Sequence, residues 1–248
     1  MNVCVLASGS AGNSTFIESK ESSILIDAGI SQRKISKNLS GIGKDLSDID
    51  AIFVTHEHTD HVSGLDKIDK NIPVYLNKPT YKNLNISIQN PIFFSSNQSM
   101  MFNELVITPV RLNHDAAEPC GFKIQDNKKV LSIFTDLGKI SNTVSQNISE
   151  SDCIVLETNY DIDMLIHGPY TQQLKQRILS DQGHLSNIDA ALCVKNHSTE
   201  KLRKVFLAHI SKNNNTQELA CNTFKKLTRD KIDKILTSQE QPTELFKV

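Results

Sequence analysis

The sequence predicts a mixed α/β (α+β) fold in which helices lie outside two packed β-sheets. Two patterns predict it: short apolar runs separated by turns dominate the first half of the 248-residue chain, and strands alternate with helical patterns later. The chain is long enough to bury a large core, and no linker rich in Pro, Gly and Ser divides it. A single domain spanning residues 1–248 is therefore the simplest prediction.

The individual elements follow from the spacing of apolar residues. Strands are expected where short apolar runs end in polar or turn residues, at 3–6, 15–18, 24–26, 51–55, 73–76, 105–110, 121–124, 130–135, 153–157 and 204–207. Helices are expected where apolar residues recur at helical spacing, at 32–39, 170–179, 188–195 and 216–226. Polar residues follow several of these strands, and loops at the ends of rigid strands are a common place for a functional site.

The composition excludes several classes of protein. With 38% hydrophobic and 22% charged residues it is that of an ordinary globular protein. No stretch approaches the roughly 20 apolar residues of a membrane helix, and the short apolar start, without a basic leader, indicates a strand and not a signal peptide. The five cysteines are widely spread and lack CxxC spacing, so neither a disulfide framework nor a thiolate zinc site is indicated. We therefore expect a cytoplasmic protein with no membrane partner.

Charge is distributed unevenly along the chain. Residues 1–194 hold 16 Lys and Arg against 22 Asp and Glu, whereas residues 195–248 hold 11 against 6. An acidic body with a basic tail fits a metal centre beside a surface that grips phosphate. A solvated C-terminal helix would give the same pattern, and the sequence leaves both interpretations open.

The strongest functional signal is the segment His56-x-His58-x-Asp60-His61, which follows an expected strand. Three imidazoles and a carboxylate on one loop can direct ligands toward two neighbouring cations. Imidazole suits Zn, Mn and Fe, and a carboxylate can bridge two ions while its charge offsets theirs. The pattern therefore predicts a site for two divalent metal ions per chain, with Zn or Mn as the first candidates and Fe as a further one.

This segment resembles the metallo-β-lactamase superfamily, and the other motifs of that superfamily occur in order, at Asp27, His114, Asp136 and His209. The resemblance implies a four-layer αββα sandwich with the site at one edge. It also implies that His56, His58 and His114 hold one metal, that Asp60, His61 and His209 hold the second, and that Asp136 bridges them. Asp27 matches the superfamily's carboxylate that orients the ligand loop without binding metal.

A later pair of motifs resembles the zinc-dependent tRNA 3′-processing nucleases. Glu157 lies in Leu156-Glu-Thr-Asn159, and His184 lies in Gly183-His-Leu-Ser-Asn187. By that resemblance His184 is the general acid for the departing oxygen and Glu157 orients it, and Asp60, His184 and Glu157 are the predicted catalytic residues. A departing sugar alkoxide is a poor leaving group, so a positioned imidazolium would lower the barrier. A histidine that only packs beside the next helix is the structural alternative.

A still narrower resemblance is to the YycJ/WalJ-like group. The matching segments are Ala7-Ser-Gly-Ser-x-Gly-Asn13, His114-Asp-Ala-x-x-Pro119, Met164-Leu-x-x-Gly-Pro-Tyr170, Gly183-His-Leu-Ser-Asn187 and His209-Ile-Ser-x-x-Asn-Asn215. The chain departs from the group after Tyr170, where Thr171 stands in place of a usual proline. Members are regarded as metal-dependent DNA exonucleases that act from the 5′ end and are linked to repair. The resemblance thus implies a nucleic-acid partner, with DNA as the substrate.

Four further residues are candidates for binding substrate. Ser8, Ser10 and Asn13 lie in a Gly-rich turn whose N–H and hydroxyl groups suit a phosphate oxygen, although an ordinary hairpin turn explains them equally well. Asn214 follows the last predicted ligand and either contacts substrate or caps the next helix.

Two rival functions remain compatible with the sequence. A thioester or lactone hydrolase of the same fold would use the same metals without needing Glu157 and His184, and a non-catalytic metal-binding protein would show no hydrolysis. Only 73 positions separate Asp136 from His209, which leaves no room for the large cap domain of some relatives. No long basic, Gly-rich arm is visible, which argues against tRNA processing.

Overall fold

The computed structural model describes residues 1–248, which divide into two compact units. The first unit comprises residues 1–111, 116–129 and 238–248, and the second comprises residues 112–115 and 130–237. The strands form two seven-stranded sheets, so the predicted mixture of two sheets with helices is confirmed. The prediction of a single domain over residues 1–248 stays a prediction.

The first unit contains a complete mixed sheet with the strand order β14-β1-β2-β3-β4-β5-β6. Its strands are β1 (Asn2–Ala7), β2 (Ser14–Glu18), β3 (Ser23–Ile26), β4 (Ala51–Phe53), β5 (Val74–Asn77), β6 (Pro91–Phe94) and β14 (Phe246–Lys247). Pairing is antiparallel from β14 to β3 and parallel from β3 to β6. Because β3, β4 and β5 run parallel, the loops after them all leave the sheet at the carboxyl end of the strands.

Three strands of the second sheet and several helical segments complete the first unit. The antiparallel strands of the second sheet in this unit are β7 (Met100–Phe102), β8 (Leu105–Arg111) and β9 (Cys120–Gln125). The helical segments are α1 (Gln32–Ser40), η1 (Leu46–Asp48), α2 (Thr59–Val62), η2 (Leu65–Lys67) and α3 (Lys78–Asn83). Helix α1 begins after Ser31, whose side chain accepts a hydrogen bond from the Lys34 N–H. Its buried Ile35 and Leu39 belong to the apolar core of this unit.

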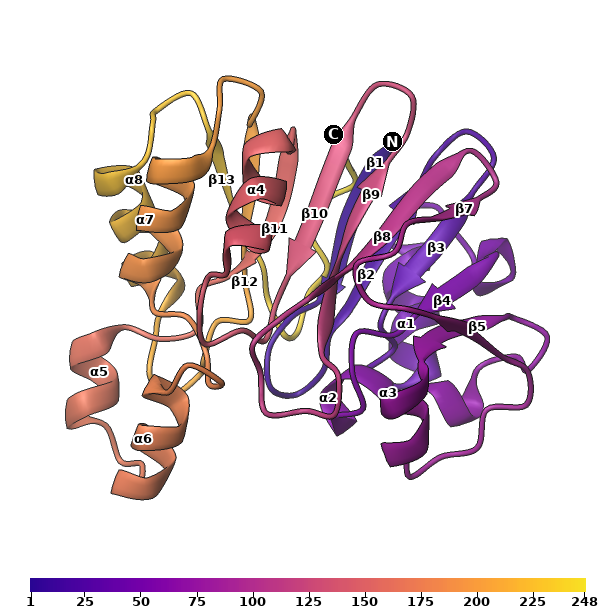
Figure 1. Cartoon of the computed structure of the whole chain (residues 1–248), viewed down its shortest axis with the longest axis horizontal. Coiled ribbons are helices and arrows are strands. Elements are labelled where there is room, and N and C mark those ends of the chain that lie inside the picture. The colour runs from indigo at the N-terminus through magenta and orange to yellow at the C-terminus, as the bar shows by residue number, and fades with distance from the viewer. The chain divides into compact units, whose positions relative to one another are not determined.

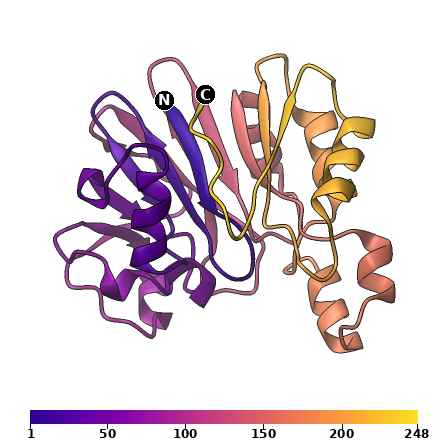
Figure 2. The same cartoon turned by 180° about the vertical axis from the view of Figure 1, so that it is seen from behind.

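The two ends of the chain meet in the first unit. Figure 2 shows the C-terminal segment running beside β1, and the Thr243 N–H donates to the Val5 carbonyl at 3.0 Å. The short strand β14 then pairs with β1, and the Val248 N–H donates to the Met1 carbonyl at 3.1 Å. The last eleven residues therefore belong to the first unit although they follow the second in sequence.

The second unit is built on four parallel strands of the second sheet. These are β10 (Val130–Phe134), β11 (Cys153–Glu157), β12 (Lys204–Ala208) and β13 (Asp233–Leu236). The helices are α4 (Asn142–Glu150), α5 (Ile162–His167), α6 (Gln172–Leu179), α7 (Asn187–His197) and α8 (Gln217–Leu227). In Figure 1, α4, α7 and α8 lie alongside these strands, and α5 and α6 form a pair beyond the strand ends. Strands β11 and β12 are buried, and parallel strands that are buried on both faces consist mostly of apolar residues.

All ten expected strands and all four expected helices are present, with ends shifted by a residue or two. Helix α6 begins at Gln172, not at residue 170, because the Thr171 hydroxyl caps it by accepting from the Leu174 N–H. Four strands, β6, β7, β13 and β14, and several helices were not predicted from the sequence. Helix α4 was missed because its sequence NTVSQNISE is mostly polar and buries only Val144 and Ile148.

No helix of the chain combines the length and the apolar character that crossing a bilayer requires. The expectation of a cytoplasmic location stays a prediction.

Candidate metal centre

In the first unit, the predicted ligand loop follows β4. His58 is the N-cap of α2, and His61 lies within that short helix. The backbone oxygen of Asp60 accepts from the Asn13 N–H at 2.7 Å, which brings the Gly-rich turn against the loop. A Cβ added at Gly29 would lie 1.6 Å from the same Asp60 oxygen, so this close approach of two backbones requires glycine. The local backbone thus fixes the loop before any metal binds.

Asp27 anchors this loop from the end of β3. Its carboxylate accepts from His61 Nδ1 at 2.7 Å, from the Thr55 N–H at 2.8 Å and from the Thr55 hydroxyl at 2.9 Å. Burial raises the pKa of Asp27, and the charge and hydrogen bonds of His61 and Thr55 oppose that rise without cancelling it. Because Nδ1 of His61 is held by Asp27, its Nε2 is the nitrogen that can bind a metal.

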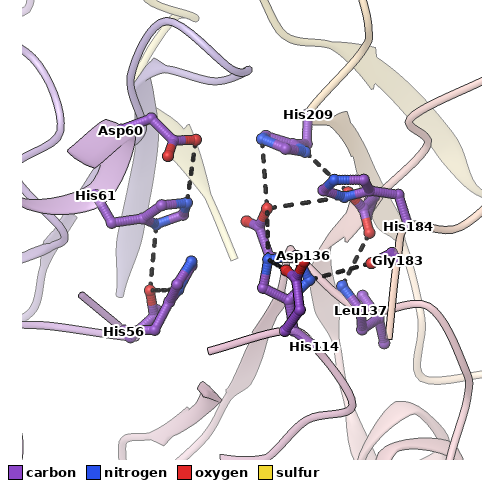
Figure 3. A network of polar contacts seen from close by, with 12 residues as sticks. His56, Asp60, His61, His114, Asp136, Leu137, Gly183, His184 and His209 are labelled. Carbon is purple, nitrogen blue, oxygen red and sulfur yellow. Dashed lines mark hydrogen bonds and ion pairs between the residues drawn. The ribbon is translucent and has the colours of Figure 1, made fainter. Parts of the chain in front are cut away.

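The imidazoles of this loop are close together. The ring centroids of His56 and His58 lie 4.6 Å apart, and those of His56 and His61 lie 4.1 Å apart. His61 Nε2 lies 3.5 Å from the Asp60 carboxylate. Figure 3 draws this contact as a dashed line. Several protonated rings at this spacing would repel one another, whereas a divalent cation takes neutral imidazoles. The donors of the first unit therefore fit a transition-metal ion.

The predicted phosphate-binding residues of the Gly-rich turn lie beside this loop. Asn13 is buried, and its Oδ1 accepts from the Gly9 N–H at 2.8 Å while its Nδ2 donates to the Asp60 carboxylate at 3.2 Å. Ser8 is buried and its N–H donates to the Ser238 carbonyl, whereas Ser10 is exposed. In this structure Asn13 therefore braces a predicted ligand, and its binding of substrate stays a prediction.

In the second unit, the predicted site residues come from the carboxyl ends of three neighbouring parallel strands and from two loops. Asp136 follows β10, Glu157 ends β11 and His209 follows β12, while His114 and His184 lie on loops. The ligand atoms of Asp136, Glu157, His184 and His209 all lie within 4.8 Å of one another. Figure 3 shows the side chains of Asp136, His184 and His209 directed toward one another.

The backbone at these strand ends adopts an unusual conformation. Asp136 and His209 have φ angles of 60° and 55°, and Asp27 of the first unit has a φ angle of 62°. A positive φ is uncommon for residues other than glycine, and such strained residues cluster at functional sites. All three residues come just after the end of a strand.

Glu157 organises the donors of the second unit. It is fully buried, and Oε1 accepts from His184 Nδ1 at 2.7 Å and from His209 Nδ1 at 2.8 Å. Oε2 accepts from the N–H groups of Leu137 and Leu185, at 3.0 and 3.2 Å. Burial alone would raise the pKa of Glu157, but the charges of and hydrogen bonds from His184 and His209 lower it to about 2. Glu157 is therefore a carboxylate that holds two imidazoles at once.

His114 and His209 each use one ring nitrogen to bond the surrounding protein. His209 Nε2 lies 3.5 Å from Asp136 Oδ1, and its Nδ1 is also 3.1 Å from Asn159 Nδ2. His114 donates from Nδ1 to the Gly183 carbonyl at 3.1 Å, and its Nε2 is 4.0 Å from Asp136 Oδ1. This pattern, with one nitrogen fixed by protein and the other directed at a shared carboxylate, is that of metal-binding histidines.

His184 differs from the other histidines of the group. Its side chain is 19% exposed, whereas those of His114 and His209 are 2% and 3% exposed. Burial lowers the pKa of His184, but the charge of Glu157 and its hydrogen bond outweigh burial and raise the pKa. His184 is thus an accessible imidazole with a raised pKa at the margin of a buried donor group.

Asn214, the last predicted substrate-binding residue, is buried at 1% exposure. Its carbonyl accepts from the Asp161 N–H at 2.8 Å, and its N–H donates to the Ser211 hydroxyl at 3.2 Å. Its contact with substrate stays a prediction. Thr55, which bonds Asp27 next to His56, and Asn159, which bonds His209, were missed by the sequence analysis. Their places directly before a ligand and two residues after Glu157 were the available signals.

Buried imidazole and carboxylate donors in both units, on a fold of two seven-stranded sheets, define a metal-dependent hydrolase. A family model described as a beta-lactamase superfamily domain matches residues 22–210. The chain therefore belongs to the metallo-β-lactamase superfamily, and the predicted fold of that name is confirmed.

Curated relatives narrow the group. The chain is 34% identical over 238 residues to exodeoxyribonuclease YycJ of Bacillus anthracis, which covers 93% of this chain and 90% of the relative. It is also 34% identical over 229 residues to exodeoxyribonuclease WalJ of Streptococcus pneumoniae serotype 2 (strain D39), with 89% and 85% of the two chains covered. The expected homology to the YycJ/WalJ-like group is confirmed.

Solved structures agree on the fold. The metallo-β-lactamase fold protein YhfI of Bacillus subtilis matches with a TM-score of 0.75 and 16% identity over 98% of each chain. The short form of human tRNase Z matches with a TM-score of 0.67 and 15% identity over 100% of each chain. At these identities the likeness concerns the fold alone.

Proposed function

We propose that this protein is a dinuclear metal-dependent phosphodiesterase that removes nucleotides from the 5′ end of DNA. The observation that carries the proposal is His184, an accessible imidazole whose Nδ1 is held by the buried carboxylate of Glu157 beside a group of metal-type donors. A hydrolase that acts on an activated ester or lactone has little need of such an acid. A nuclease needs one, because the departing sugar alkoxide is a poor leaving group until it is protonated. The names of two curated relatives, both exodeoxyribonucleases, support DNA as the substrate.

In this proposal His56, His58 and His114 would hold one metal, and Asp60, His61 and His209 would hold the other. Asp136 would contribute to both sites, and Asp27 holds Nδ1 of His61 so that its Nε2 would be the ligating atom. The donor set suits Zn, Mn or Fe. When bound, the pair of ions supplies an activated water and offsets the charge that develops on the phosphoryl group.

The chain's own residues perform the proton transfer. Glu157 fixes the tautomer and orientation of His184 through Nδ1, which leaves Nε2 to hold a proton toward the substrate. As water adds to phosphorus and the bond to the sugar oxygen breaks, His184 donates that proton to the departing oxygen. Glu157 acts on His209 in the same way, so one carboxylate positions both the acid and a metal ligand.

The test is cleavage of a 5′-labelled duplex DNA in the presence of Mn²⁺ by wild type, Asp136→Ala and His184→Ala. His167→Ala is a matched control, because His167 is an exposed histidine whose ring bonds only the Asp163 carbonyl of its own helix. We expect short labelled products from wild type and His167→Ala and none from the other two. Wild type that leaves DNA intact but turns over a thioester or lactone would contradict the proposal.

A further inference from the structure

Exposed aromatic rings lie at the edge of the first unit's sheet. Strand β6 ends the strand order of that sheet, and Phe93 on it is 42% exposed. Tyr81 of α3 is 36% exposed, and its ring centroid lies 5.3 Å from that of Phe93 at an interplanar angle of 72°. Single exposed apolar residues are common, but adjacent exposed rings form an apolar patch. Such a patch indicates a surface that binds a ligand or a partner.

Phe93 borders two hollows in the surface. The larger has a volume of about 650 Å³ and is lined by Asn77, Lys78, Pro79, Phe93, Phe94, Ser95 and Glu118. The smaller has a volume of about 230 Å³ and reaches Gln98 and Met100. Both lie within the first unit. A flat ring bordering both hollows offers a stacking surface with space beside it.

The charges around the rings favour an anionic, aromatic ligand. Lys78 Nζ lies 5.9 Å from the Phe93 centroid, and Lys82 is exposed one helical turn later on α3. Glu118 is the acidic residue of the lining, and its carboxylate accepts from the Ser96 hydroxyl at 2.6 Å. Amino groups of nucleobases can also donate to such a carboxylate. A nucleic-acid strand fits this arrangement, because its bases can stack on the rings while its phosphates contact the lysines.

This surface lies at the carboxyl ends of the strands, as does the predicted ligand loop. Strands β4, β5 and β6 are parallel neighbours, so their carboxyl ends lie at the same end of the sheet. That end carries the ligand loop after β4, helix α3 after β5 and the end of β6. Two strand spacings amount to about 10 Å. The Ala117 N–H donates to Glu57 Oε1 of the ligand loop at 2.7 Å, and Glu118 of the hollow is the next residue.

We propose that Phe93, Tyr81 and Lys78 form a stacking site for single-stranded DNA that guides the strand toward the ligand loop. The inference rests on the proposed nuclease function and adds the form in which the substrate is held. Bases stack on the rings, and the lysine contacts the phosphate between them. Pairing of β6 with a second copy of the chain is the less favoured occupant. The strand has four residues and begins with Pro91, and both features blunt an edge.

The test measures binding without cleavage. Fluorescence anisotropy of a labelled 20-nucleotide oligo(dT) is followed in EDTA with wild type, Phe93→Ala, Phe93→Tyr and Ile92→Ala. Ile92 is the matched control, because it is the neighbouring residue of β6 and is 40% exposed. We expect Phe93→Ala to raise the Kd about tenfold. Phe93→Tyr and Ile92→Ala should stay near wild type.

Lys78→Ala separates the charge from the ring. Loss of a phosphate contact should reduce the slope of log Kd against log salt by about one, whereas Phe93→Ala should leave that slope unchanged. Melting temperatures of all variants show whether each is folded.

The site is refuted if oligo(dT) does not bind to wild type or binds Phe93→Ala as tightly as wild type. Equal weakening in Phe93→Ala and Ile92→Ala would also overturn it. So would a wild-type dimer in light scattering that Phe93→Ala converts to a monomer, since the edge would then be a self-association surface. Phe93-dependent binding by a protein that cuts no DNA would contradict the proposed function and leave this site standing.

Discussion

The two donor groups of this protein are built in different ways. In the first unit, His56, His58, Asp60 and His61 come from one continuous loop, and Asp27 with the Gly-rich turn holds that loop against its strand. In the second unit, the donors come from three strand ends and two loops, and Glu157 bonds two of them, His184 and His209. Asp27 bonds two residues of one loop, whereas Glu157 bonds four residues from three segments. The second group therefore depends more on a single buried carboxylate.

The largest effect that tests this difference is on stability. Glu157→Ala removes the acceptor of two imidazoles, of which that of His209 is buried, and of two N–H groups, and we expect it to lower the free energy of unfolding by about 3–5 kcal/mol. Asp27→Ala should cost about 1–3 kcal/mol, because it leaves fewer buried donors without an acceptor.

The measurement is urea unfolding of both variants in EDTA, so that metal binding does not contribute. Equal losses in the two variants would break the comparison.

The next effect concerns metal affinity in the first unit. Asn13 donates to the Asp60 carboxylate, and removal of a residue that orients a ligand costs roughly 10–100-fold in metal affinity. We expect Asn13→Ala to show this loss in competition with a chromophoric chelator, and Ser10→Ala, a change at an exposed residue of the same turn, to show none. If Asn13→Ala bound metal as tightly as wild type, the bracing role would be wrong.

The smallest effect concerns the cysteines, none of which belongs to either group. Burial raises the pKa of Cys4 to about 11 and that of Cys193 to about 12, and it raises the pKa of Cys120 well above its usual range. Cys221 alone is not buried. We expect a thiol reagent at neutral pH to modify about one thiol in the native chain and to leave hydrolysis unchanged. Rapid modification of a second thiol with loss of activity would contradict this.

The same contrast explains what the sequence could predict. The first group was visible as a motif because its donors are adjacent along the chain. The second group could be predicted only through a family resemblance, because its residues are far apart in the sequence. They come together only when β10, β11 and β12 pair in parallel and the nearby loops fold against them: His114, Asp136, Glu157, His184 and His209. The bond between Glu157 and His209 was not predicted, because no local pattern reports which strand ends are neighbours.

The fold shows the same limit. Strands β11 and β12 are apolar except for one charged residue at an end of each, Glu157 and Lys204, and were predicted almost to the residue. Strand β6 was missed because it lies at an edge, begins with proline and exposes Ile92 and Phe93. Strand β14 has two residues and forms only because its partner β1 is far away in sequence. Elements defined by tertiary pairing leave little trace in a local window.

The most direct test of the central claim compares two phosphodiesters in His184→Ala. We expect DNA cleavage to fall by about 10²–10⁴-fold, because the departing sugar oxygen needs a proton. Cleavage of bis(p-nitrophenyl) phosphate, whose leaving group departs without a proton, should fall by less than about tenfold. Equal losses on both substrates would show that His184 only supports the fold. An undiminished rate on DNA would show that it is not the acid.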